Sequence, residues 1–420
     1  MAGGWWRWRR CVRRAGAWPA VCCLVAGLLT GCGDRPSVPG RYRAEIQRML
    51  DRRAEAVRER DRDAFLATVD RRADRYRTGQ RRVFDHLADV PVDSWSYRLT
   101  GTGGFRPAPG TGHRVAARVE VRYRLTGYDT APVTAEEFLT LVRRDDRWYV
   151  AADGGRRAPR QLWEQGDVQV VRGRRALVLG VGQKPERLAE VARMADRAVP
   201  AVDRVWPAGW SRRVVVEVPA SLDRMAELLG SPAEGYRGIA AVTTGQTGGG
   251  PATRADRVIV NPDAYPVLGE RGRQIVLTHE TVHVATRTAT TRGTPLWLSE
   301  GFADWVAYRG TGRSPREVAP ELTRAVAAGK PLQELPATED FRFGGDATTL
   351  ARAYEESWLA CRMIADRWGE GKLVAFYRAV GDGPDTGRRT AVRDALRSVL
   401  GVTEEEFTAS WRTYAHRVLG

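Results

Sequence analysis

Residues 275–285 read IVLTHETVHVA and carry two histidines four positions apart, His279 and His283, with Glu280 directly after the first. In an α-helix, residues i and i+4 share one face, so both imidazoles can reach one cation at about 2.0–2.1 Å. Glu280 projects to the side of that pair, where its carboxylate can take a proton from a metal-activated water. This stretch therefore predicts a helix that carries two ligands of a zinc site.

The alternative is a surface helix on which two histidines fall one turn apart by chance. The chain has only five histidines, which makes a chance HExxH motif rare. The neighbours of the motif are apolar, and Glu280 is the only acidic or basic residue between Gln274 and Thr286, counting histidine as neutral. These flanks favour a buried metal-binding helix.

A catalytic zinc site needs a third protein ligand and an open fourth position. Residues 296–305 read LWLSEGFADW and place Glu300 seventeen residues after His283. The carboxylate of Glu300 can complete the ligand set. Asp304 lies one helical turn later, where it can accept the free N–H of a ligating histidine, which we expect to be His279.

This combination of HExxH with W-L-x-E-G-F-A resembles the gluzincin metallopeptidases, the clan of the M1 aminopeptidases and thermolysin-like enzymes. It is most similar to their compact peptidase MA-like members. The resemblance implies a zinc-dependent peptidase that cleaves a peptide or protein substrate through a metal-activated water. It assigns His279, His283 and Glu300 as zinc ligands and Glu280 as the general base. It assigns Asp304 as the carboxylate that accepts a hydrogen bond from a ligating histidine.

A second, weaker match lies at residues 353–363, AYEESWLACRM, which resemble the M1 stretch Y-E-K-G-A. The resemblance implies that Tyr354 donates a hydrogen bond to the developing oxyanion; the alternative is a core or capping tyrosine. Glu355 and Glu356 are expected to be solvated helix charges; the alternative is that one of them supports Tyr354. The G-x-M-E-N segment that holds a free substrate N-terminus in M1 enzymes is missing, so aminopeptidase action is not supported. The strand expected at 258–260, or that at 239–243, can instead pair with an extended peptide.

Hydrophobic periodicity predicts an α+β protein of several parts. Residues 41–155 begin with an amphipathic helix and a second helical stretch carrying Phe65, Leu66 and Val69, and continue as alternating strands, most clearly over 115–125. This pattern resembles an NTF2-like cone, in which helices cover a curved antiparallel sheet. Residues 160–235 then predict the order strand, strand, helix, strand, helix, and the chain after Gly272 predicts mainly helices and loops. The gluzincin resemblance implies that residues 160–270 form an α/β subdomain of a zincin-type peptidase and that 271–420 form its mainly helical zinc-site subdomain. The Gly/Thr-rich stretch around 247–251 favours a hairpin tip over a phosphate loop.

The first 31 residues combine a basic start with a short apolar run and predict a signal peptide. They end in Leu-Thr-Gly-Cys32, which resembles a bacterial lipobox. This implies lipidation at Cys32, a tether over 32–40 and anchoring to the outer face of a bacterial cell membrane. The alternatives are an ordinary signal peptide or a membrane anchor. With Cys32 lipidated and the signal removed, Cys361 is alone, so no disulfide framework is expected.

The formal charge of +16 first suggests nucleic acid as a partner. Only three of the 67 basic residues are lysine, and five arginines belong to the signal segment, so we interpret the excess as compositional bias. No nucleic-acid partner is expected. The competing hypothesis for the whole chain is a catalytically silent cell-surface lipoprotein that uses the peptidase fold as a scaffold for binding.

Overall fold

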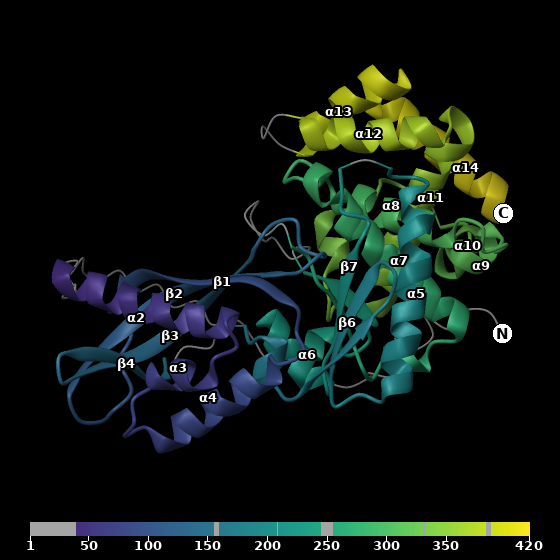
Figure 1. Cartoon of the computed structure of the whole chain (residues 1–420). Helices are drawn as coiled ribbons and strands as arrows, with labels where there is room; N and C mark the ends of the chain where they lie inside the picture. The colour runs from purple at the N-terminus through teal and green to yellow at the C-terminus, as the bar shows by residue number, and fades with distance from the viewer. Residues whose placement is uncertain (1–38, 155–158, 208, 245–254, 331, 384–387) are drawn as a thin grey trace, which may run out of the picture. The chain divides into compact units, whose positions relative to one another are not determined.

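A computed structural model describes residues 39–420, apart from 155–158, 208, 245–254, 331 and 384–387. The chain divides into two units (Figure 1). The amino-terminal unit runs to Leu125 and includes Thr134–Pro159, whereas the carboxyl-terminal unit consists of Thr126–Val133 and Arg160–Gly420. The signal segment, Cys32 and the predicted hairpin tip at 247–251 lie outside the described residues. Both units combine helices with a sheet, which confirms the α+β class.

The described part of the amino-terminal unit begins with three helices, α2 (Gly40–Arg58), α3 (Arg62–Ala67) and α4 (Asp74–His86). The predicted first helix is confirmed as α2. The second was expected to include Val69, but α3 ends at Ala67 and Val69 forms a β-bridge with Val150. Helix α4 was not predicted: Phe84 is its one buried residue, so its sequence offers few apolar positions from which a helix could be inferred.

The strands β1 (Val92–Thr102), β2 (His113–Leu125), β3 (Val133–Arg144) and β4 (Arg147–Asp153) form a sheet in that order. The pairs β1–β2 and β3–β4 are antiparallel. The alternation over 115–125 buries every second side chain of β2, as expected for a sheet with one covered face. Helices followed by an antiparallel sheet are the predicted order; the assignment to the NTF2-like cone stays a prediction.

In the carboxyl-terminal unit the described strands form a five-stranded sheet in the order β5-β6-β7-β9-β8. Their bounds are β5 (Val168–Arg172), β6 (Ala176–Val181), β7 (Val214–Val218), β8 (Ala241–Thr243) and β9 (Val258–Val260). The central strands β6, β7 and β9 are parallel, and the edge strands β5 and β8 are antiparallel to their neighbours. Helix α5 (Pro185–Asp203) connects β6 to β7, and α6 (Leu222–Leu229) follows β7. The predicted strand–strand–helix–strand–helix order is confirmed.

After β9 the described chain is helical, as predicted for the region beyond residue 271. It consists of α7 (Glu270–Thr286), α8 (Leu296–Tyr308), α9 (Pro315–Val318), α10 (Pro320–Ala327), α11 (Ala347–Trp368), α12 (Glu370–Asp382), α13 (Arg388–Ala395) and α14 (Glu404–Leu419). One apolar cluster joins α8, α11, α12 and α14, and it includes the buried, unpaired thiol of Cys361. A second cluster seats α5 and α7 on the sheet.

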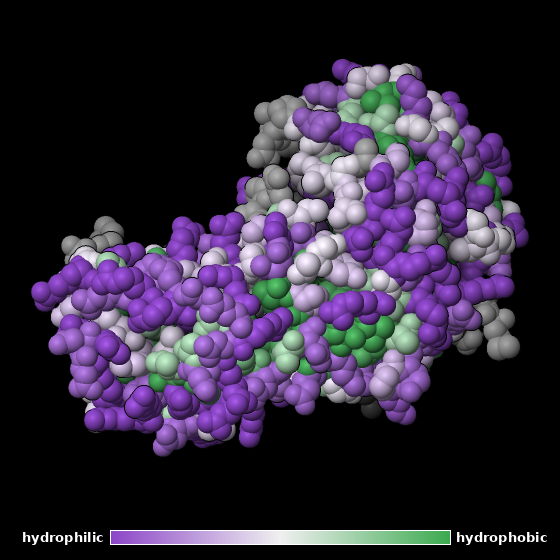
Figure 2. All heavy atoms as spheres, viewed as in Figure 1, coloured by the Kyte–Doolittle hydropathy of each residue, from purple (hydrophilic) through white to green (hydrophobic). Residues whose placement is uncertain are grey.

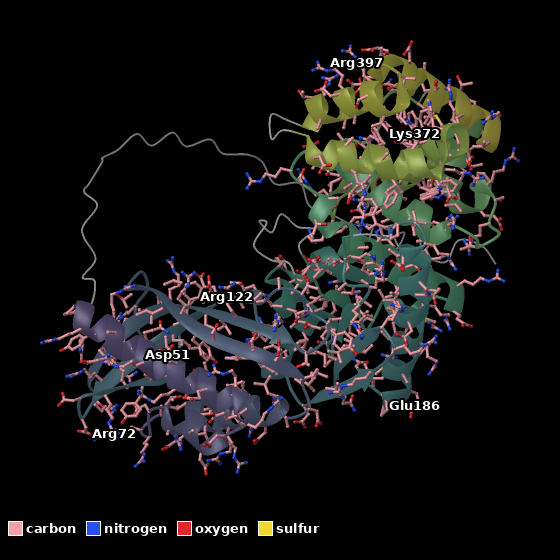
Figure 3. All side chains as sticks on the ribbon, turned by 45° about the horizontal axis from the view of Figure 1, so that its top comes forward. Asp51, Arg72, Arg122, Glu186, Lys372 and Arg397 are labelled. Carbon is pink, nitrogen blue, oxygen red and sulfur yellow. The ribbon has the colours of Figure 1, made fainter. Side chains whose placement is uncertain are left out.

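The exposed side chains are predominantly hydrophilic on the visible face of each unit (Figure 2). Charged residues come from every part of the chain: Figure 3 labels Arg72 and Arg122 in the amino-terminal unit and Lys372 and Arg397 in the other, all four exposed. Within residues 39–420 and outside the gaps, none of the helices has both the length and the apolar character that crossing a bilayer requires.

Candidate metal centre

Helix α7 carries the HExxH motif and is buried along most of its length. Its side chains from Ile275 to His283 are all shielded from solvent. The helix packs against α5 on one side and α8 on another, and the residues of β8 also contact it. A polar pair such as His279 and His283 is therefore held inside the protein, which is what the apolar flanks of the motif predicted.

Helix α8 brings Glu300 to the two histidines. The Nε2 atoms of His279 and His283 are 3.0 Å apart, and Glu300 Oε2 lies 3.3 Å from the first and 3.6 Å from the second. Ligand atoms about 2.0–2.1 Å from a tetrahedral zinc ion are about 3.3–3.4 Å from one another. The three separations bracket that spacing, and two imidazoles with one carboxylate are a zinc donor set, so these residues fit the ion.

Asp304 lies on the far side of the His279 ring. Its Oδ1 is 2.8 Å from His279 Nδ1, which directs Nε2 of that ring toward His283 and Glu300. Burial by itself lowers the pKa of His279, but the carboxylates of Asp304 and Glu300 outweigh it and raise the pKa above the usual histidine value. Burial raises the pKa of Glu300, yet the two imidazoles hold this pKa well below its usual range.

Glu280 is 4% exposed and has a partner that the sequence did not indicate. The Thr243 hydroxyl, at the end of β8, lies 2.6 Å from Glu280 Oε2. The two residues are 37 positions apart and belong to different elements, so no local spacing connects them. The only sequence signal was the expected strand over 239–243, whose place beside α7 could not be inferred.

Tyr354 of α11 lies beside the predicted ligands. Its ring centroid is 6.3 Å from that of His279 and 5.4 Å from that of Phe341, and its side chain is half-buried. The structure thus brings all six predicted site residues of the carboxyl-terminal unit into one region, whereas Cys32, the predicted lipidation site, is outside the described residues.

The expectation that Glu355 and Glu356 are solvated is wrong. The Glu355 carboxylate accepts hydrogen bonds from the backbone N–H groups of Glu321 and Leu322, at 3.2 Å and 2.7 Å, at the start of α10. Burial raises the pKa of Glu355 to about 8, despite these two donors. Glu356 is paired with Arg352 at 2.8 Å. Helix α11 is packed on several sides, which a helical pattern of mixed polarity did not reveal.

Gly301, next to the predicted ligand Glu300, allows α8 and α11 to touch. A Cβ atom added at Gly301 would lie 2.3 Å from the backbone oxygen of Ser357. The absence of a side chain at this position therefore sets the distance between the helix that supplies Glu300 and the helix that supplies Tyr354.

No protein-family model matches this sequence, and the search of curated proteins gives no match. Solved structures similar to this chain are M1 zinc metallopeptidases. A two-domain M1 zinc metallopeptidase bound to L-arginine is 16% identical, with a TM-score of 0.34 over 77% of this chain and 69% of that chain. The M1 zinc metallopeptidase of Deinococcus radiodurans is 16% identical, with a TM-score of 0.34 over 77% of this chain and 75% of that one.

A variant of the Deinococcus radiodurans enzyme bound to the substrate Tyr-Ser-Ala gives 17% identity and a TM-score of 0.34, over 77% of this chain and 70% of that one. Similarity this low does not transfer an activity. The chemistry of this chain therefore rests on the geometry of its own residues.

Proposed function

We propose that this chain is a zinc-dependent peptidase that hydrolyses peptide bonds. The observation that carries the proposal is the buried group of two imidazole nitrogens and one carboxylate oxygen at zinc-ligand spacing, with the Glu280 carboxylate on the adjacent position of the same helix. A structural zinc site is normally closed by four protein ligands, whereas three leave a position for a reactant. Three ligands with a neighbouring carboxylate therefore favour catalysis.

His279, His283 and Glu300 would hold the ion, and Asp304 would fix the tautomer of His279 by accepting a hydrogen bond from its Nδ1–H group. A zinc ion held there supplies a Lewis acid that polarises a carbonyl and lowers the pKa of water. Glu280 would accept a proton from the attacking water and pass it to the leaving amine. Tyr354 would donate a hydrogen bond to the oxyanion of the tetrahedral intermediate.

The test measures zinc content by mass spectrometry and peptide cleavage on a broad peptide library for the wild type and Glu280→Gln. Both proteins are expected to bind one zinc ion, and only the wild type to cleave, because Gln cannot accept the proton; general-base loss costs about 10²- to 10⁴-fold in rate. Glu186→Gln, on the exposed start of α5, is the matched control and should cleave normally (Figure 3). Tyr354→Phe should lower kcat without changing zinc content.

A wild-type protein that holds zinc and cleaves nothing in the library would contradict the enzyme and favour the silent scaffold. Equal cleavage by Glu280→Gln and the wild type would exclude Glu280 as the base. Loss of zinc from Glu280→Gln would place this side chain among the ligands instead.

We further propose that the protein works outside the cytoplasm as a lipoprotein anchored through Cys32, on a peptide or protein substrate. Support comes from the basic and apolar halves of residues 1–31 and from the small residues before Cys32. Mass spectrometry of the mature amino terminus tests this. A diacylglyceryl Cys32 as first residue is expected, and a protein that keeps residues 1–31, or that is cleaved elsewhere, would contradict it.

A further inference from the structure

Thr243 donates a hydrogen bond to the side chain of Glu280. Its hydroxyl oxygen is 2.6 Å from Glu280 Oε2 and 3.1 Å from the Glu280 backbone oxygen, and Thr243 is fully buried. A hydroxyl has one proton to donate. The carboxylate is the nearer and the charged acceptor, and 2.6 Å is the length typical of an O–H to O⁻ hydrogen bond. We therefore assign the proton to Oε2.

We propose that Thr243 is a positioning residue for the general base: it fixes the Glu280 carboxylate so that Oε1 is presented for proton transfer. This inference rests on the peptidase function proposed above. A glutamate side chain on a helix has several rotatable bonds, and its terminal torsion is broad. With Oε2 bound to Thr243, that torsion is restricted and the two carboxylate oxygens are no longer equivalent.

The strand that carries Thr243 is itself fixed to the helix that carries Glu280. Strand β8 pairs with β9, with Thr243 opposite Val258. Arg287, directly after α7, donates from Nη2 to the backbone oxygen of Thr244 and from Nε to Asp256 Oδ2, each at 2.8 Å. Arg287 thus ties the ends of β8 and β9 to the end of α7. The hydroxyl donor is consequently held in place before a substrate arrives, as preorganised sites require.

The alternative is that the Thr243 hydroxyl only stabilises the fold and has no effect on catalysis. In that case the loss of the hydroxyl would affect stability alone. A positioning role predicts a loss of kcat with little change in KM, because misplacement of a reacting group by about 1 Å costs about 100-fold in rate.

The kinetic experiment compares Thr243→Val, which keeps the shape and loses the hydroxyl, with Thr243→Ser, which keeps the hydroxyl. Thr243→Val is expected to lower kcat by about 10- to 100-fold at unchanged KM and zinc content, and Thr243→Ser to restore most of it. Thr281→Val is the matched control, since it removes a similarly buried hydroxyl that, among the described residues, donates to the Leu277 backbone oxygen, at 2.6 Å. Its kcat should equal that of the wild type.

A second readout does not depend on activity. In the metal-free protein, Thr243→Val should lower the unfolding temperature by about 2–4 °C, and by less in a Glu280→Ala background, where the carboxylate acceptor is gone. An equal loss in both backgrounds would show that Thr243 has no interaction with the Glu280 side chain and would overturn the inference.

The outcomes separate the inference from the proposed function. If the wild type cleaves peptides and Thr243→Val cleaves them at the same kcat, or if Thr243→Ser is as slow as Thr243→Val, the positioning role is overturned and the peptidase stands. If the wild type cleaves no peptide, the peptidase proposal fails, and the positioning role with it.

Discussion

The five residues at the centre of the site are ionisable, and each of them is between 2% and 5% exposed: His279, Glu280, His283, Glu300 and Asp304. Removing charges from water costs free energy unless partners compensate them. Three of these five side chains are carboxyl groups and two are imidazoles, so acidic groups outnumber basic ones. A divalent cation between the imidazoles and Glu300 would balance this excess of negative charge, which is a physical reason for the donor set to attract a metal.

The role of Asp304 gives a prediction for zinc affinity. Asp304→Asn keeps the shape and an acceptor for His279 Nδ1–H but removes the charge that raises the pKa of His279. A less basic imidazole is a weaker ligand, so zinc affinity should fall by about 10- to 100-fold. Competition with a chelator measures the dissociation constant. Asp394→Asn, at an exposed position, is the control, and an unchanged constant for Asp304→Asn would refute the role.

At the level of elements, the site depends on the close contact between α8 and α11. Gly301 makes that contact possible, because any side chain there would overlap the backbone of Ser357. The same contact aligns Glu300 and Tyr354, which come from these two helices. Gly301 has no reactive side chain, yet it couples the position of the ligand Glu300 to that of the proposed oxyanion donor Tyr354.

Gly301→Ala should separate the two helices. We expect a loss of about 1–3 kcal/mol in the free energy of unfolding, typical of overpacking, together with weaker zinc binding because Glu300 is adjacent. Urea unfolding of the metal-free protein and a zinc titration measure the two effects. Gly371→Ala is the matched control: it also lies in a helix, α12, and a Cβ there meets nothing within 4 Å, so stability should be unchanged or slightly higher. Equal behaviour of the two variants would refute the packing argument.

At the level of the whole molecule, the described part of the chain passes between its two units three times, after residues 125, 133 and 159. Residues 126–133 connect β2 to β3 but belong to the carboxyl-terminal unit. There, Asp129 pairs with Arg257 at 2.7 Å, and both side chains are almost fully buried. Glu217 of β7 lies 3.7 Å from the same guanidinium, and burial raises the pKa of Glu217. A short segment between two strands therefore completes an ion pair inside the other unit.

Asp129→Asn should destabilise the carboxyl-terminal unit by about 3–5 kcal/mol, because it leaves the buried Arg257 without the carboxylate closest to it. Chemical unfolding of the full chain measures the loss. Asp93→Asn breaks the pair of Asp93 with Arg124, whose side chains are far more exposed, and should cost at most about 1 kcal/mol. Similar losses for the two variants would contradict the assignment of 126–133 to this unit.

The sequence predicted most of the elements, because these follow from local periodicity, and it predicted the composition of the site from the HExxH spacing together with the gluzincin resemblance. Alternation revealed β2, and the spacing of apolar residues revealed α2 and α5. The prediction failed where a helix has few apolar residues, as in α4, or where polar residues of a helix are covered by other elements, as with Glu355 and Glu356.

By itself, the sequence determined which residue types can form the site: His279 and His283 share a helix face because the backbone repeats every 3.6 residues, whatever surrounds it. Only the tertiary structure decided what touches that face. The Thr243 hydroxyl on Glu280, the backbone contact at Gly301 and the two N–H groups on Glu355 join residues at least 33 positions apart. Such partners depend on how whole elements pack, and no local pattern records that packing.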